Sequence, residues 1–513
     1  MSTPEIRPST STAPGSLETS LPRRRLHRKV FGIGLGPVLA AIVYFLMPKG
    51  VHPSVVDSAI PVTDNALAIA AAVATLMGTW WVTEAIPLAA TALVPLVAFP
   101  LAGVQDFGKT AAPYANGTIF LFMGGFFLAL SIQRWNLHRR IALRTVLVVG
   151  TKPKQIILGL MVATGVLTMW VSNTATAVMM LPIAMSVLSL LYEGADSSKL
   201  LSSNFGKSLV LGVAYAASIV SVSTIISTPP NTLLRAYLAD THGITISFGR
   251  WMLFGVPLGW GFLFVGWWIL TSVIFKPEIN EIPGGKKLIQ DELAKMGPMS
   301  RGEKTVGVIF VAAALSWVFL PTFFPDTFSD ELVAMVIALS LFLIPVDPFK
   351  GIPVLDWKTA KGIPWDVLLL FGGGLSLSAA FTFTGFSAWI GDRSSGLAGL
   401  PTIVLIFLVT VLIVILTEFT SNTATAAAFL PIMGSVAIGM GVDVMMLVIP
   451  VALASTYGFM MPAGTPPNAI AYSSGYLRIS DMIKAGFWLN VIGAVLITIF
   501  TMTLGPLVLG YSL

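Results

Sequence analysis

Apolar segments long enough to cross a lipid bilayer recur along nearly the whole chain, from Phe31 to Leu509. The 513 residues are 55% hydrophobic and only 11% charged, and their mean hydropathy is +0.85. Soluble domains carry about 25% charged residues, so this composition excludes an ordinary soluble protein. A transmembrane β-barrel would instead show alternating segments of about ten residues. The sequence therefore predicts an all-α polytopic membrane protein.

Hydropathy divides the apolar sequence into about eleven membrane crossings and two further stretches. The predicted crossings are 31–47, 66–83, 85–104, 117–133, 208–238, 251–275, 305–324, 331–346, 367–390, 445–470 and 485–509. The two further stretches, 155–191 and 400–440, each carry a polar hexapeptide near the middle. Each is predicted to be a re-entrant hairpin, which enters and leaves the membrane on the same side.

The distribution of positive charge supports this arrangement. With both hairpins treated as re-entrant, 25 of the 30 Lys and Arg residues fall on one side of the membrane. This alternation would fail if either hairpin were a single crossing. The positive-inside rule then predicts a multi-pass cell-membrane protein with a cytoplasmic N-terminus and an exterior C-terminus. Because the net charge of +6 follows the membrane bias, it does not indicate a nucleic-acid partner.

The two hairpins belong to an internal repeat. The sequence Ser-Asn-Thr-Ala-Thr-Ala occurs at Ser172–Ala177 and again 249 residues later at Ser421–Ala426. Each copy is followed by Thr-Pro-Pro-Asn, at Thr228–Asn231 and at Thr465–Asn468. The first hairpin is predicted to open to the cytoplasm and the second to the exterior, which makes the repeats inverted. Inverted repeats with interrupted helices are typical of secondary transporters, whose binding site lies between the two halves.

The same features divide the chain into four parts. We expect a disordered basic cytoplasmic tail over 1–29, and the first helix with inverted repeat 1 over 30–275. A polar cytoplasmic linker follows at 276–304, and inverted repeat 2 occupies 305–513. An amphipathic stretch within the linker is interpreted as a connecting helix.

The repeated motifs supply uncharged polar groups at the predicted hairpin tips, where helix ends also leave backbone groups unpaired. Oxygens of the paired Ser and Asn residues, with backbone carbonyls, suit a small hard cation. Amide nitrogens and the hydroxyls of Thr174 and Thr423 suit the oxygens of an anion. Consecutive prolines break each downstream helix, and the hydroxyls of Thr228 and Thr465 would complete the anion contacts. One isolated triplet would more often join neighbouring helices, but two copies at opposed tips favour a binding site.

No Lys, Arg or His lies in the predicted membrane core, and the chain contains no Cys. An anion there would be held by dipoles, hydroxyls and amides, and a bare dianion in a dry site would be strongly penalised. Co-bound cations would supply the positive charge, which predicts cation coupling and no covalent cofactor. The lack of a nucleophile–base pair argues against an intramembrane enzyme. Opposed dead-end hairpins argue against a channel.

Only two acidic residues lie inside apolar sequence, Glu84 and Glu418. Glu84 is expected in an interfacial turn before Pro87. Glu418 lies three residues before Ser421, so two roles are open for it. Its carboxylate accepts hydrogen bonds that hold the hairpin tip, or it tunes a cation site.

The paired Ser-Asn-Thr motifs, each with a downstream Thr-Pro-Pro-Asn, resemble those of the divalent anion/sodium symporter family. The similarity runs from about Phe31 to Leu509 and includes Trp80-Trp81-Val82-Thr83-Glu84-Ala85-Ile86-Pro87. Within that family, the chain resembles the bacterial sodium-coupled C4-dicarboxylate symporters. The resemblance implies a homodimer in the lipid membrane, with a fixed scaffold domain and a transport domain that carries substrate by an elevator motion.

The resemblance also implies the residues of three sites. The first sodium site would use Thr168, Ser172, Asn173 and the carbonyl of Ser227. The second would use Thr417, Thr420, Asn422 and the carbonyl of Gly464. The carboxylates of the substrate would contact Asn173, Thr174, Thr228, Asn422, Thr423 and Thr465.

One departure from the family concerns Ser227, because related proteins carry glycines through this stretch. If the carbonyl of residue 227 needs a dihedral angle that only glycine adopts, the first cation site would be weakened or differently selective. The resulting hypothesis is sodium-coupled uptake of succinate, fumarate or malate. A sodium-independent dicarboxylate exchanger and a sodium-coupled sulfate or citrate transporter are the alternatives, since the same donors fit all of these anions.

Overall fold

A computed structural model describes residues 23–55, 62–150, 152–191, 203–279, 285–397 and 399–513. The predicted all-α fold is confirmed, because these residues are almost entirely helical. The described residues form only two short strands, β1 (Pro345–Asp347) and β2 (Ile352–Pro353), which pair antiparallel. Most of the predicted tail, residues 1–22, lies outside the described residues. Helix α1 begins at Arg23, so the disorder expected for 23–29 is wrong. Consecutive Arg and Lys are good helix formers and extend the apolar helix that follows them.

The first half of the chain contains helices up to the predicted linker. They are α1 (Arg23–Leu46), α2 (Ala66–Thr83), α3 (Leu88–Thr91), α4 (Val94–Leu101), α5 (Phe107–Ala111), α6 (Gly117–Arg134), α7 (Leu137–Val149), α8 (Pro153–Thr168), α9 (Asn173–Leu191), α11 (Asn204–Ile219), α12 (Pro229–His242) and α13 (Phe248–Ile269). Short 3-10 and π turns join some of them, including η3 (Val220–Ser223) and η4 (Leu270–Ile274).

The linker and the second half contain the remaining helices. They are α14 (Gly285–Lys295), α15 (Arg301–Phe323), α16 (Asp330–Leu343), α17 (Trp357–Ala360), α18 (Trp365–Phe383), α19 (Phe386–Ser394), α20 (Thr402–Thr417), α21 (Asn422–Gly439), α22 (Met445–Ala454), α23 (Pro466–Ser473), α24 (Ile479–Met502) and α25 (Leu504–Leu509). Helix α14 falls where the amphipathic connecting helix is expected. A hydrogen bond from Lys295 lowers the pKa of the Glu292 carboxyl on this helix, and Arg139 of α7 pairs with it at 2.8 Å.

Nine helices in the described ranges are long and apolar enough to cross a membrane. This number differs from the eleven predicted crossings because three predicted segments are short or interrupted and one hairpin arm is long. Segment 85–104 divides into α3 and α4, segment 331–346 holds the 14-residue α16, and segment 445–470 is interrupted after α22. Helix α21 meets the length criterion although it is one arm of a hairpin. Length and hydropathy alone therefore do not separate a crossing from a hairpin arm.

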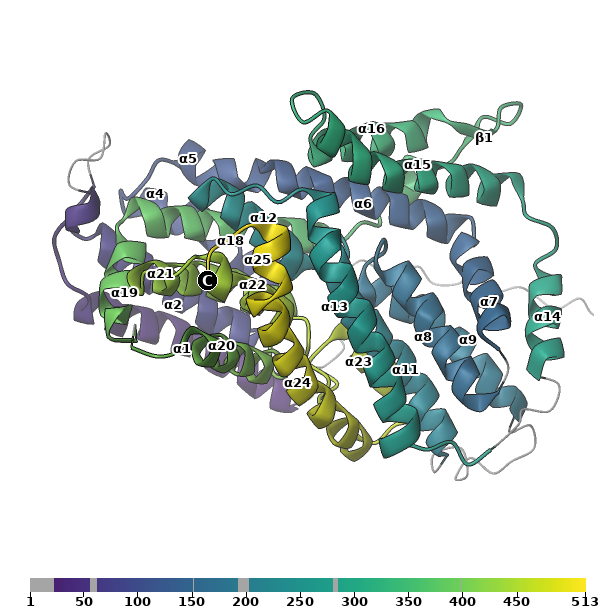
Figure 1. The fold of residues 1–513 in the computed structure, drawn as a ribbon. Helices are drawn as coiled ribbons and strands as arrows, with labels where there is room; N and C mark the ends of the chain where they lie inside the picture. Colours follow the sequence, from purple (N-terminus) through teal and green to yellow (C-terminus); the bar gives the residue numbers. More distant parts are fainter. Residues whose placement is uncertain (1–22, 56–61, 151, 192–202, 280–284, 398) are drawn as a thin grey trace, which may run out of the picture.

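Both predicted hairpins are pairs of helices joined by four residues. Helices α8 and α9 form the first pair and are separated by residues 169–172, and α20 and α21 form the second, separated by 418–421. In each pair the second arm begins at the Asn of the repeated motif. Figure 1 shows α8 and α9 beside α7 and α11, whereas α20 and α21 lie beside α19 and α22. The two hairpins thus belong to different ends of the helical array.

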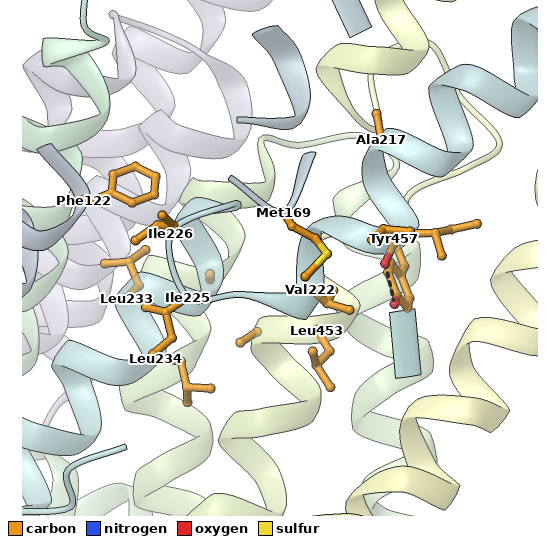
Figure 2. Close-up of a cluster of buried hydrophobic side chains, with 14 of the residues drawn as sticks. Phe122, Met169, Ala217, Val222, Ile225, Ile226, Leu233, Leu234, Leu453 and Tyr457 are labelled. Atoms are coloured by element: carbon orange, nitrogen blue, oxygen red, sulfur yellow. Dashed lines mark hydrogen bonds between the residues drawn. The ribbon is translucent and has the colours of Figure 1, made fainter. Parts of the chain in front are cut away.

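Two broken helices lie between the hairpins. In the first, the chain leaves helical geometry after η3 and resumes it at Pro229, and in the second it leaves after α22 and resumes at Pro466. Proline suits the first turn of a helix because the missing N–H needs no partner there. Figure 2 shows apolar side chains packed around the first break, including Met169, Val222 and Tyr457. The Tyr457 hydroxyl donates to the carbonyl of Ile219 at 3.2 Å, which ties the two broken helices together.

Burial separates the centre of the molecule from its lipid-facing rim. The window Asn204–Ser223, which covers α11 and η3, is 94% buried, whereas the window Lys29–Leu46 of α1 is 17% buried. Helix α11 packs against both arms of the first hairpin and against α23. The broken helices and the hairpin tips therefore sit in the interior, where exposed backbone would otherwise meet lipid.

Candidate functional site

The two hairpin tips and the two Thr-Pro-Pro-Asn motifs line one cavity of ≈ 880 Å³. Nine of the predicted site residues contribute to its wall: Ser172, Asn173, Thr174, Thr228, Thr420, Asn422, Thr423, Gly464 and Thr465. Thr168, Ser227 and Thr417 are absent from the wall and fully buried, so they lie behind it. The structure thus brings the two halves of the repeat together although their motifs are 249 residues apart.

Besides the hairpin tips, the cavity wall includes the ends of four other helices. Its wall includes Lys29 near the start of α1, Glu84 just after α2, Gln133 near the end of α6 and Asp366 near the start of α18. These are the helix ends that the alternation of charge assigns to a single side. The described loops that join the opposite helix ends contribute no residue to the wall. Glu84 lies in the turn expected for it, with a left-handed φ of 51°.

The first hairpin tip presents its polar groups in two directions. The Asn173 side-chain oxygen accepts a hydrogen bond from the Thr174 backbone N–H at 2.8 Å. The Ser172 hydroxyl accepts from the Ala175 N–H at 3.3 Å. Behind the tip, the Thr168 hydroxyl donates to the carbonyl of Ala217 at 2.9 Å. The first two contacts cap the start of α9, and the third joins the end of α8 to α11.

Ser227 does not adopt a glycine-only conformation. Among the described residues that are not glycine, only Glu84 and Asn136 have a positive φ, and Gly464 is not among the positive-φ glycines. The condition for a weakened or differently selective first site is therefore not met, because neither Ser227 nor Gly464 has a positive φ. The serine adds a hydroxyl, which donates to the carbonyls of Ser221 and Thr224, the latter at 3.0 Å.

The second hairpin tip gathers oxygen atoms. The side-chain oxygen of Asn422 lies 3.0 Å from the Thr417 hydroxyl. The same position lies 3.0 Å from the carbonyl oxygen of Ser455 and 2.7 Å from that of Gly464. Without an ion, rotation of the amide would place its N–H₂ against these oxygens. With the amide oxygen inward, the cluster has the chemistry that a small cation requires.

Asn231 and Asn468 hold the two broken helices in the same way. The Asn231 amide donates to the carbonyls of Val222 and Thr224, and the Asn468 amide donates to those of Gly458 and Met461. Thr224 and Met461 are equivalent positions of the repeat, so each amide closes the same kind of loop. The side-chain oxygens of both residues are buried and have no hydrogen-bond partner among the described residues.

The two threonines of the Thr-Pro-Pro motifs differ. Thr465 caps α23, because its hydroxyl accepts from the Asn468 N–H at 3.3 Å. The Thr228 hydroxyl makes no such bond to α12 and is buried without a partner in the part of the chain that the structure describes. Thr228 also contributes to the cavity wall, and its buried hydroxyl has no hydrogen bond that a ligand would have to replace.

Thr420 stands apart from the other predicted ligands of the second sodium site. Its hydroxyl bonds with that of Thr425 at 2.7 Å and with the carbonyl of Leu416 at 2.8 Å. Both contacts lie within the second hairpin. Thr417, Asn422 and Gly464 form the oxygen cluster without it.

Two contributors to this region were missed in the sequence. The Ser455 carbonyl joins the oxygen cluster, and no sequence signal marks a backbone carbonyl that points into a site. Asn490 of α24 donates to Glu418 Oε1 at 2.6 Å and accepts from the Phe459 N–H at 3.1 Å. An amide inside the apolar helix 479–502 is a signal that could have found it, because polar groups there need partners.

The fold and the cavity are those of a secondary transporter with a candidate binding site between inverted repeats. Comparison with known proteins then places the chain. It belongs to the family described as the sodium:sulfate symporter transmembrane region, which matches residues 38–510. This match confirms the resemblance to divalent anion/sodium symporters.

Among curated proteins, two relatives illustrate the similarity. The chain is 38% identical over 490 residues to the sodium-dependent dicarboxylate transporter SdcS of Staphylococcus saprophyticus, covering 94% of this chain and 92% of that protein. It is 40% identical over 445 residues to SdcS of Staphylococcus aureus (strain USA300), covering 85% and 86%.

Solved structures share the fold at low identity. The YdaH transporter of Alcanivorax borkumensis aligns with a TM-score of 0.55 and 13% identity, over 94% of this chain and 98% of that one. MtrF of Neisseria gonorrhoeae aligns with a TM-score of 0.56 and 13% identity, over 95% and 97%. At this identity the likeness concerns the arrangement of helices alone.

Proposed function

We propose that this protein takes up C4-dicarboxylates such as succinate, fumarate and malate together with sodium. The observation that carries the proposal is the single cavity formed by both hairpin tips and both Thr-Pro-Pro-Asn motifs. Relatives at 38% and 40% identity are named as sodium-dependent dicarboxylate transporters, which supports this choice of ion and substrate.

The charge of the cavity wall favours coupling to a cation. Its only charged residues, Lys29, Glu84 and Asp366, lie near helix ends at one face, away from the hairpin tips. A dicarboxylate between the tips therefore has no Lys or Arg beside it in the wall. Two negative charges in such surroundings are strongly unfavourable unless cations accompany them. Sodium ions bound at the tips would provide this compensation.

The site residues have separate roles in this proposal. Thr417, Asn422 and the carbonyl of Gly464 hold one sodium ion, and the structure supports this set by their mutual distances. Thr168, Ser172, Asn173 and the carbonyl of Ser227 hold another. Amide and hydroxyl groups facing the cavity bind the substrate carboxylates, namely those of Asn173, Thr174, Thr228, Asn422, Thr423 and Thr465. The carboxylates of the substrate thus bind between the two ions.

Transport requires that the site open to each side in turn. The cavity wall includes helix ends that the positive-inside rule assigns to the cytoplasm, with the N-terminus there and the C-terminus outside. We place this structure in a state that releases substrate into the cell. An elevator motion of the hairpins and broken helices against the remaining helices, in a homodimer, would present the same site to the exterior.

The test uses purified protein in liposomes and labelled succinate. Uptake should require an inward sodium gradient and fall to background when potassium or choline replaces sodium. Equal uptake in all three salts would overturn the proposal. Stimulation of uptake by succinate inside sodium-free liposomes would instead identify an exchanger. If sulfate or citrate competed with labelled succinate more strongly than fumarate and malate do, the protein would be a sulfate or citrate transporter instead.

A further inference from the structure

Between the shared Thr and the shared Ser-Asn-Thr, the two hairpin tips differ at three positions, and only one of these differences changes the charge. Thr168-Met169 of the first tip corresponds to Thr417-Glu418 of the second, at the same offset of 249 residues as the hexapeptides. Glu418 is fully buried. No Lys, Arg or His among the described residues forms an ion pair with it. The second tip therefore carries a buried acid that the first tip lacks.

Both carboxyl oxygens of Glu418 accept hydrogen bonds. Its Oε1 accepts from the Met460 N–H at 2.8 Å and from the Asn490 amide at 2.6 Å. Its Oε2 accepts from the Met461 N–H at 2.8 Å. All three partners are donors, which stabilise a carboxylate and not a carboxylic acid. These donors are neutral. A carboxylate at Glu418 therefore has no positive charge beside it to compensate for its burial.

Glu418 also sits directly against the oxygen cluster of the second tip. It follows Thr417 in the chain, and its Oε2 lies 2.8 Å from the point where a Cβ atom on Gly464 would be. A side chain at residue 464 would therefore require the Glu418 carboxyl group to shift from its hydrogen-bonded position. In the first repeat the equivalent pair is Met169 and Ser227, and there the side chain at 227 is accommodated. The first repeat therefore has Met169 and Ser227 where the second repeat has Glu418 and Gly464.

We propose that Glu418 is a positioning residue that makes the second sodium site the stronger of the two. The inference rests on the proposed sodium coupling and deepens it. A carboxylate next to the Thr417, Asn422 and Gly464 oxygens attracts a cation over a short distance through a medium of low dielectric constant. The first site, built from Thr168, Ser172, Asn173 and the carbonyl of Ser227, has only neutral oxygens. At low sodium the second site fills first and orders its tip, and the first site fills at higher sodium.

The experiment measures initial succinate uptake in proteoliposomes as a function of external sodium. Glu418→Gln should raise the sodium concentration for half-maximal uptake by about tenfold or more, with a smaller change in maximal rate at saturating sodium. Glu418→Asp keeps the charge and should remain closer to the wild type. Met169→Leu, at the equivalent position of the first tip, is the matched control and should leave the sodium dependence unchanged.

The outcomes distinguish this inference from the proposed function. If wild-type uptake does not depend on sodium, the proposed function fails. If wild-type uptake depends on sodium and folded Glu418→Gln has the same half-saturation, the inference alone is overturned.

A second comparison decides the question if Glu418→Gln does not fold. It measures the rise in thermal unfolding midpoint caused by low sodium. Thr417→Val should abolish this rise, whereas Thr168→Val should retain it. Equal loss in both variants would overturn the inference.

Discussion

The Thr417 hydroxyl lies 3.0 Å from the side-chain oxygen of Asn422, which joins the end of one hairpin arm to the start of the other. The same hydroxyl reaches the carbonyl of Ser455 at 2.7 Å, so the hairpin tip is also joined to the end of α22. A ligand bound at this point would contact three separate segments of the chain. Binding can therefore be linked to the position of the hairpin as a whole.

Loss of either motif asparagine should stop transport without unfolding the protein. Asn173→Ala and Asn422→Ala each remove an amide that lines the cavity, and we expect sodium-driven succinate uptake to fall by about tenfold or more. Thr410→Val is the control, because the Thr410 hydroxyl bonds only within α20, to Ile406. Uptake at the wild-type rate by either alanine variant would remove the site assignment.

The two Thr-Pro-Pro threonines should respond differently to valine. Thr465→Val removes the cap of α23, which costs about 1 kcal/mol, so its unfolding midpoint should fall. Thr228→Val removes a hydroxyl with no described partner, so its midpoint should stay near that of the wild type while the KM for succinate rises. Thermal unfolding and uptake kinetics check the two effects. A lowered midpoint for Thr228→Val with unchanged KM would contradict the ligand role.

The buried ion pair between α7 and α15 should matter for stability and not for the sodium dependence of uptake. Arg140 Nε lies 2.6 Å from Glu303 Oε1, and both side chains are 5% exposed. Arg140→Met leaves Glu303 without its partner, which costs about 3–5 kcal/mol. The double variant Arg140→Met/Glu303→Leu should recover much of this loss in thermal unfolding. No recovery would show that the pair acts through contacts other than charge, such as the bond from Arg140 to the Gly297 carbonyl.

Close packing of the second hairpin against α19 should make Gly439 sensitive to a single methyl group. A Cβ on Gly439 would lie 2.0 Å from the carbonyl oxygen of Gly391, which is closer than van der Waals contact allows. We expect Gly439→Ala to lower stability by about 1–3 kcal/mol. Gly261→Ala in α13 is the control, because nothing lies within 4 Å of the added atom. Equal unfolding midpoints for the two variants would refute the contact.

The sequence by itself determined the class of protein and the two hairpins. The duplicated hexapeptide and the alternation of Lys and Arg located 155–191 and 400–440, and the structure has helix pairs there. Both signals can be read from the sequence because they depend on residue type. Prolines break helices, and Lys and Arg concentrate on one side of the membrane. The polar motif residues of the cavity wall, among them Asn173, Thr174, Asn422 and Thr423, were found for the same reason, since each is a polar side chain in an apolar segment.

Only the tertiary structure decided which backbone atoms join those side chains. The Ser455 carbonyl, the division of 85–104 and the contact of Glu418 with Asn490 all depend on how distant segments pack. A carbonyl oxygen is common to every residue, so its direction carries no sequence signature. Likewise, the left-handed requirement suspected at Ser227 could be tested only once its dihedral angle was known. The physical reason is that the proposed cation site depends on backbone carbonyls, whose directions are set by the fold and not by residue type.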